Sequence, residues 1–118
     1  MIQRLQPGPR LSAAVVHGGI VYISGQVPDT LHADVATQTR EILAKIDLLL
    51  SEAGSDKGRL LNVNVWLADI ITFDQMNQVW EAWLPPGQPP ARATVEARIA
   101  NPGYRVEIAA IAASQPIV

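Results

Sequence analysis

The chain has 118 residues, enough for one domain with its own hydrophobic core, and its 48% of hydrophobic residues against 17% of charged ones indicates extra apolar surface buried between subunits. The formal net charge is −2 and no run of lysine or arginine occurs, which argues against a nucleic-acid partner. Without cysteine there is no disulfide or thiolate chemistry, and no apolar run is long enough for a membrane span. We predict a cytoplasmic protein with one domain over residues 1–118 and no membrane contact.

The first predicted element is a β-hairpin. Residues 11–16 and 20–24 are rich in β-branched and aliphatic side chains, and the pair Gly18-Gly19 between them is a strong hairpin signal. Gly25 then breaks the second strand. A glycine there either marks a plain strand end or bulge, or leaves the backbone open to close approach by a ligand or another chain.

A helix is predicted next, with Asp34 as its N-cap. Its apolar residues recur at helical spacing, and Gly54 stands where a left-handed C-cap would end the helix. The apolar stripe consists of Ile42, Leu43, Ile46, Leu49, Leu50 and Ala53.

The middle of the chain predicts a strand followed by a second helix. Residues 61–67 alternate apolar and polar side chains, which is typical of a strand with one face in the core and would turn Trp66 to the opposite face. The helix begins with a capping-box sequence at Thr72 and ends before the prolines that follow Leu84. Its apolar stripe suits core packing. Asn77 lies at the edge of that stripe, where its amide can meet either a ligand or solvent.

Two more strands, one starting at Ala91 and one within residues 104–112, are expected to form a second hairpin. Arg92 and Thr94 share one face of the first strand, and Glu107 lies among apolar residues of the second. A suitable register would bring Arg92 and Glu107 together, although the sequence does not determine that register. The resulting order is ββαβαββ, an α+β fold with both helices on one face of the sheet.

The sequence lacks the residues that several kinds of functional site require. The two histidines, at positions 17 and 32, are not at metal-ligand spacing, so no metal site is expected, and no GxSxG pattern surrounds Ser24. The residues that remain for chemistry are Arg92, Glu107, Ser24, Thr94 and Gly25. Such a set can anchor a small carboxylate and orient a water for hydrolysis without a cofactor. The competing interpretation is that Arg92 only pairs with a structural acid, Glu96 or Glu107.

Four segments of the chain carry a family resemblance. They are Val21-Tyr22-Ile23-Ser24-Gly25-Gln26-Val27, Gln75-Met76-Asn77-Gln78-Val79-Trp80, Pro90-Ala91-Arg92-Ala93-Thr94-Val95-Glu96 and Val106-Glu107-Ile108-Ala109-Ala110-Ile111-Ala112. Together they resemble the Rid family, the reactive intermediate deaminases or YjgF-like proteins, over residues 10–113. Residues 12–19, with Ala68-Asp69, are most similar to the YoaB-like branch.

This resemblance implies a chorismate-mutase-like fold assembled as a homotrimer, with clefts at the subunit interfaces. Deaminating members hydrolyse reactive 2-imino and 2-enamine acids, of the 2-aminoacrylate type, to 2-oxo acids and ammonia. They need no cofactor of their own, so the implied partner is a small 2-imino or 2-oxo acid. The resemblance assigns Arg92 to the substrate carboxylate and Glu107 to the attacking water.

The resemblance also implies that Ser24 and Gly25 line the cleft, that Thr94 presents its backbone or hydroxyl to the reacting group, and that Asn77 shapes the wall. Thr94 stands where many deaminating members have cysteine, and residues 10–12 offer no match for an aromatic that often closes the cleft. These departures leave the size of the substrate open. Three other functions stay open: a module that binds a small carboxylate without turnover, an endoribonuclease, which the acidic balance disfavours, and a structural or chaperone-like surface protein, which only the apolar content supports.

Overall fold

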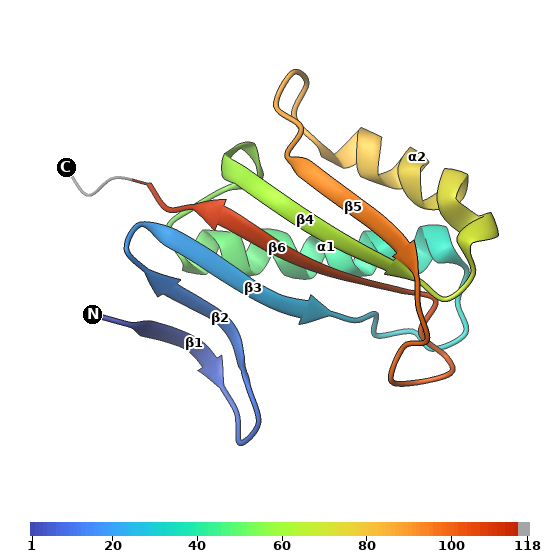
Figure 1. Cartoon of the computed structure of the whole chain (residues 1–118), viewed down its shortest axis with the longest axis horizontal. Coiled ribbons are helices and arrows are strands. Elements are labelled where there is room, and N and C mark those ends of the chain that lie inside the picture. The colour runs from blue at the N-terminus through green and yellow to red at the C-terminus, as the bar shows by residue number, and fades with distance from the viewer. Residues whose placement is uncertain (116–118) are drawn as a thin grey trace.

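Six strands and two α-helices make up the fold in this computed structural model, which describes residues 1–115. The elements are β1 (Gln3–Pro7), β2 (Ser12–His17), β3 (Ile20–Gln26), α1 (Val35–Glu52), β4 (Leu60–Leu67), α2 (Phe73–Trp83), β5 (Ala91–Glu96) and β6 (Val106–Ala113). The strands form one mixed sheet in the order β1-β2-β3-β6-β4-β5, in which β4 and β5 run parallel and the other neighbours antiparallel (Figure 1). The last three positions of the predicted domain, 116–118, lie outside the described residues.

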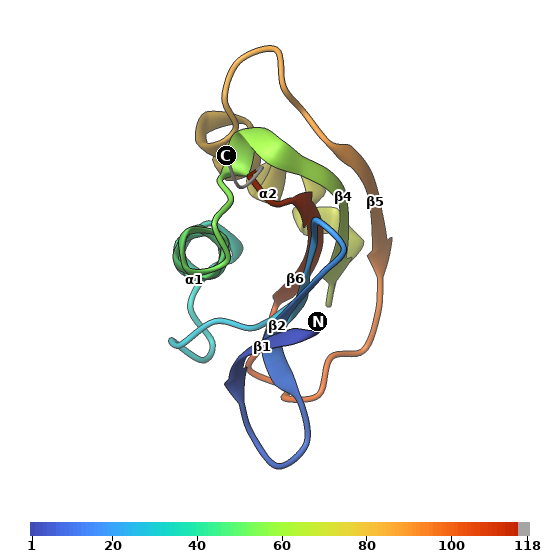
Figure 2. The same cartoon turned by 90° about the vertical axis from the view of Figure 1, so that its left-hand side faces the viewer.

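Both helices lie on one face of the sheet, as Figure 2 shows, with α1 against β3 and β6 and α2 beside α1. The predicted α+β fold with two helices on one face is therefore confirmed. The predicted order ββαβαββ omitted β1, because this edge strand is mostly exposed and has no apolar alternation to reveal it. Neither α1 nor α2 has the length and apolar content that a membrane crossing requires, within residues 1–115.

The predicted first hairpin is confirmed as the pair β2 and β3. His17 pairs with Ile20 across a turn made by Gly18 and Gly19. These glycines have φ of 59° and 78°, the left-handed conformation that a two-residue hairpin turn requires. The hairpin could be predicted reliably because its turn involves only four consecutive residues, 17–20.

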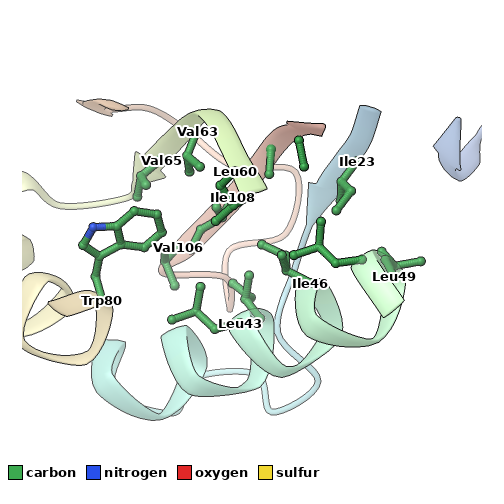
Figure 3. Close-up of a cluster of buried hydrophobic side chains, with 14 of the residues drawn as sticks. Ile23, Leu43, Ile46, Leu49, Leu60, Val63, Val65, Trp80, Val106 and Ile108 are labelled. Carbon is green, nitrogen blue, oxygen red and sulfur yellow. The ribbon is translucent and has the colours of Figure 1, made fainter. Parts of the chain in front are cut away.

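The helix α1 also follows its local signals. The Asp34 carboxylate accepts a hydrogen bond of 2.8 Å from the backbone N–H of Thr37, and Gly54 follows the helix with φ of 75°. The predicted apolar stripe is buried, apart from the half-buried Ala53. Its side chains meet those of β3, β4, β6 and α2 in one hydrophobic core (Figure 3).

The strand β4 departs from strict alternation at its start. Its register with β6 shifts between Leu60 and Asn62, so Leu60 is buried and Leu61 is 47% exposed. The prediction that Leu61 faces the core is wrong, because a bulge puts one extra residue into the strand and breaks the alternation there. The remaining predicted core positions of this strand are buried.

The start of α2 differs from the predicted capping box. Thr72 makes no side-chain hydrogen bond to the helix, and its hydroxyl donates instead to the carbonyl of Asp69 at 2.7 Å. Thr72 is instead the last residue of a 3₁₀ turn, Ile70–Thr72, which leads into the helix. Met76 and Trp80 of the predicted stripe are buried, whereas Phe73 is 37% exposed.

The predicted hairpin of the last two strands is wrong. β4 lies between β5 and β6, parallel to β5 and antiparallel to β6. The chain passes from β4 to β5 through α2, the kind of crossover that joins parallel neighbours. Residues 97–105 then pass the end of β4 to reach β6.

Candidate functional site

Arg92 lies on the helix-covered face of the sheet. In the parallel ladder it is aligned with Val63, which is buried in the core, and aligned residues of neighbouring strands point to the same face. Its guanidinium carbon Cζ is 5.4 Å from the ring centre of Trp80 and 5.7 Å from that of Phe73. Arg92 therefore extends from β5 toward α2 and contacts aromatic rings.

No acid within residues 1–115 forms an ion pair with Arg92, where the structure has a single salt bridge, between Lys45 and Asp29. Burial lowers the pKa of Arg92, and the negative charge of Glu81 partly opposes this shift. Glu96, one of the predicted structural partners, instead accepts a hydrogen bond of 3.1 Å from the backbone N–H of Ile70. The partly buried guanidinium thus lacks a direct counter-charge in the described chain.

Thr94 and Asn77 lie on the same side of the sheet as Arg92. Thr94 is aligned with the buried Val65, and its hydroxyl oxygen is buried without a hydrogen-bond partner in the described residues. Asn77 lies four residues after Phe73 and three before Trp80, so these side chains share one face of α2. Arg92, Thr94 and Asn77 form what we call the β5–α2 group.

Glu107 lies on the opposite face, which the helices leave open. It is aligned with Trp66, and its neighbours along β6, Val106 and Ile108, are buried on the helix side. Burial raises the pKa of the Glu107 carboxyl above its ordinary value. The register that would bring Glu107 beside Arg92, which the sequence left open, is not the one observed, because the sheet separates the two side chains within one chain.

Gly25 is packed directly against Glu107. A Cβ atom at position 25 would overlap Glu107 Oε2 and would lie 3.0 Å from Cδ and 3.3 Å from Cγ. The register of β3 with β6 is irregular between Ile23 and Gln26, so the predicted bulge or strand break is present at this glycine. Gly25 is therefore needed for close approach, and the group that approaches is Glu107 of the same chain.

The hydroxyl of Ser24, the residue before Gly25, forms two hydrogen bonds. It donates to the carbonyl of Ala13 at 3.0 Å and accepts from Gln26 Nε2 at 3.3 Å. Ser24, Gly25 and Glu107 form what we call the β3–β6 group. The six predicted site residues thus divide into two groups of three on opposite faces of the sheet.

A small hollow adjoins the β3–β6 group. It has a volume of about 230 Å³ and is lined by Trp66, Glu107 and the segment 97–100. Trp66 therefore lies on the face opposite the core, as predicted, and lines this hollow beside the loop. Arg92 does not line this hollow.

Sequence reasoning missed the aromatic partners of Arg92. Phe73 and Trp80 belong to a stripe that was assigned to core packing, and the crossover that brings α2 over β5 is a long-range feature. The feature of the sequence that could have revealed them is the seven-residue spacing of Phe73 and Trp80, which places both on one face of a helix. As for metals, no three histidine, aspartate or glutamate side chains of the described chain gather as ligands would.

Comparison with known proteins gives consistent matches. Residues 1–114 match the family model described as Endoribonuclease L-PSP. A RutC family protein of Haemophilus influenzae is 44% identical, covering 94% of this chain and 97% of the relative, and the RutC family protein YoaB of Escherichia coli K12 is 42% identical, covering 95% and 97%. The crystal structure of NMB1025 from Neisseria meningitidis, a member of the YjgF protein family, superposes with a TM-score of 0.96 at 42% identity, covering 99% of this chain and 98% of that one.

Proposed function

The chain belongs to the endoribonuclease L-PSP family, also called the YjgF/Rid family, with YoaB among its similar relatives, and from this premise we propose that it hydrolyses reactive 2-imino and 2-enamine acids to 2-oxo acids and ammonia. The proposal requires a cation that binds the substrate carboxylate and a group that activates water. Arg92 and Glu107 supply these two functions. No cofactor takes part.

The observation that carries the proposal is the state of Arg92. Its guanidinium is partly buried, has a pKa lowered by burial, and forms no ion pair with an acid of the described chain. A desolvated cation without a counter-charge is stabilised by any anion that reaches it. A guanidinium can also hold a carboxylate through two parallel hydrogen bonds, which orients a 2-imino acid as well as binding it.

Glu107 suits the second function. Burial raises the pKa of its carboxyl, and a carboxylate with a raised pKa is a better proton acceptor for water. In the proposed step the imine is protonated on nitrogen, and Glu107 takes a proton from water as the water oxygen bonds to C2, which forms a neutral carbinolamine. Glu107 then returns that proton to the nitrogen. The C–N bond breaks as the hydroxyl oxygen forms the C=O bond, and the hydroxyl proton passes through Glu107 to the departing ammonia. An enamine enters the same sequence by taking a proton on C3, which gives the protonated imine.

Arg92 and Glu107 can share one substrate only where two copies of the chain meet, because they lie on opposite faces of the sheet. We therefore place the cleft at an interface of the homotrimer expected for the chorismate-mutase-like fold, with the β5–α2 group of one copy facing the β3–β6 group of another. The open face suits such a contact, because Tyr22 and Val95 are 46% and 51% exposed there.

The other predicted residues then have supporting functions in that cleft. Gly25 and the backbone of Ser24 line the wall beside Glu107. The Ser24 hydroxyl, already engaged with Ala13 and Gln26, stiffens that wall. Thr94 presents its backbone or its hydroxyl beside Arg92, and this hydroxyl has no hydrogen-bond partner among residues 1–115. Asn77 closes the same side from α2.

An amino-acid oxidase that releases imino acids, with semicarbazide as a trap, tests the activity. The wild-type protein is expected to divert the imino acid and so reduce semicarbazone formation. Arg92→Ala should lower kcat/KM about 100-fold or more through loss of the charge-assisted bonds, whereas Arg40→Ala, at an exposed position on α1, should behave as wild type. An unchanged rate in the Arg92 variant would refute the proposal.

Mixing two inactive variants tests the shared cleft. Arg92→Ala and Glu107→Gln chains, coexpressed at equal levels, should recover about a quarter of the wild-type activity, because random assembly gives that fraction of clefts both native residues. Sites built within one chain would recover none.

Two other functions make different predictions. A sensor that binds a carboxylate without turnover would bind a 2-oxo acid through Arg92 and show no deamination in wild type. An endoribonuclease would cleave single-stranded RNA, but the net charge of −2 provides no basic surface for it.

A further inference from the structure

We propose that Phe73 and Trp80 are positioning residues, which hold the Arg92 guanidinium against their rings and leave its N–H groups free for a carboxylate. The inference rests on the carboxylate-binding part of the proposed function and does not require turnover. It assigns to two aromatic side chains of α2 a function that core packing alone does not explain.

The guanidinium lies close to both rings. Phe73 and Trp80 are seven residues apart on α2, which corresponds to about two turns and places both on one face of the helix. The Arg92 Cζ lies 5.7 Å from the ring centre of Phe73 and 5.4 Å from that of Trp80. Both distances fall within the range of attraction between a cation and an aromatic face.

Aromatic partners and acidic partners have different consequences for an arginine. A carboxylate partner would accept hydrogen bonds from the guanidinium edge and so occupy the donors that a substrate needs. An aromatic face attracts the charge without accepting those hydrogen bonds in the plane of the group. The structure has the second arrangement, since no acid of residues 1–115 forms an ion pair with Arg92.

One hydrogen bond links the start of α2 to β5, and a second stabilises the turn that carries it. Glu96, four residues after Arg92 and on the same face of β5, accepts from the backbone N–H of Ile70 at 3.1 Å. Asp69 accepts from the N–H of Ile71 at 3.0 Å. These bonds hold the turn that immediately precedes Phe73, so the ring is anchored beside Arg92 although Phe73 is partly exposed.

Substitution of the two aromatic residues differs in its cost to the stability of the fold. Trp80 is buried in the core, and its replacement lowers stability whatever it does to Arg92. Phe73 is partly exposed, so Phe73→Leu keeps an apolar side chain and removes the ring at little cost in folding. Phe73→Tyr keeps the ring and serves as the conservative rescue.

The test measures the dissociation constant of 2-oxobutyrate by calorimetry, together with kcat in the oxidase-coupled assay. Phe73→Leu should raise Kd about two- to five-fold, the loss expected for one exposed cation–π contact, and should leave kcat within about two-fold, because the ring does not touch the reacting atoms. Phe73→Tyr should retain the wild-type Kd. Lys57→Met is the matched control, since it removes the other cation–π contact of α2, at Trp83, and should not change Kd.

A Kd unchanged by Phe73→Leu, while Arg92→Ala abolishes binding, would overturn the inference and leave the proposed function intact. A loss of kcat at unchanged Kd would overturn it as well. Conversely, wild-type binding that weakens in Phe73→Leu, without any deamination by the wild type, supports the inference and refutes the proposed function. If the wild type binds no 2-oxo acid, the inference fails, and the oxidase-coupled assay decides the proposed function separately. A shift of the Arg92 Nε–H resonance in Phe73→Leu, measured without ligand, supports the stacked geometry, and an unmoved resonance contradicts it.

Discussion

Gly25→Ala adds one methyl group at the point where β3 meets Glu107. Gly25 has no positive φ, so alanine fits its backbone conformation and the perturbation is a purely steric one. The new Cβ would overlap Glu107 Oε2 and lie only 3.0 Å from Cδ and 3.3 Å from Cγ. The carboxylate must therefore move, while the rest of the fold has no reason to change.

The structure sets the expected magnitudes. Carbon and oxygen atoms need roughly 3.5 Å between them, so the carboxylate must shift by about 1 Å or more, and a misplacement of this size can cost about 100-fold in rate. Overpacking usually costs about 1–3 kcal/mol, and the lower end applies here because the end of a glutamate side chain can rotate away. We expect turnover to fall about 100-fold and the melting temperature to fall by only about 4 °C.

A double-mutant cycle with Glu107→Ala isolates the cause. In that background the carboxylate is absent, so Gly25→Ala should have almost no further effect on the rate in the oxidase-coupled assay. Circular dichroism melts of all four proteins give the stability terms. The reasoning is refuted if Gly25→Ala retains wild-type turnover, or if it slows the Glu107→Ala protein as much as it slows the wild type.

Two further predictions concern stability. Burial raises the pKa of Glu107 above its ordinary 4.5, so this group stabilises the fold at lower pH, and that contribution is lost as the pH rises through the raised value. The Glu107→Gln variant should therefore melt at a higher temperature than wild type at neutral pH, and at about the same temperature below pH 4.5. A difference in melting temperature that widens on acidification would contradict this. Gln38 is fully buried, donates to the carbonyls of Thr30 and Gly103 at 3.0 and 2.9 Å and accepts from Arg105 N at 2.7 Å, so Gln38→Met should cost about 3 kcal/mol in urea denaturation. The exposed Gln78→Met should cost almost nothing, and equal losses would argue against the buried network.

Several features of this protein were decided by the sequence alone. The turn at Gly18-Gly19, the cap at Asp34 and the stripe of α1 all follow from residues within a few positions of one another, so their physical causes are contained in short segments. The alternation around Arg92 also correctly placed Arg92 and Thr94 on one face of β5. The residues and motifs of the sequence also identified the six candidate site residues, and the family resemblance gave each a predicted role, because motifs do not depend on the arrangement of residues in space.

Only the tertiary structure decided which of those residues can meet. The insertion of β4 between β5 and β6 depends on pairing between strands far apart in the chain, and neither period nor turn residues encode that order. In this arrangement Arg92 lies on the helix side, beside Phe73 and Trp80, and Glu107 lies on the open face against Gly25. The sequence of a strand separates its two faces but does not say which faces of neighbouring strands coincide. The register with β4 decides that, and here it sets Arg92 and Glu107 on opposite sides of the sheet.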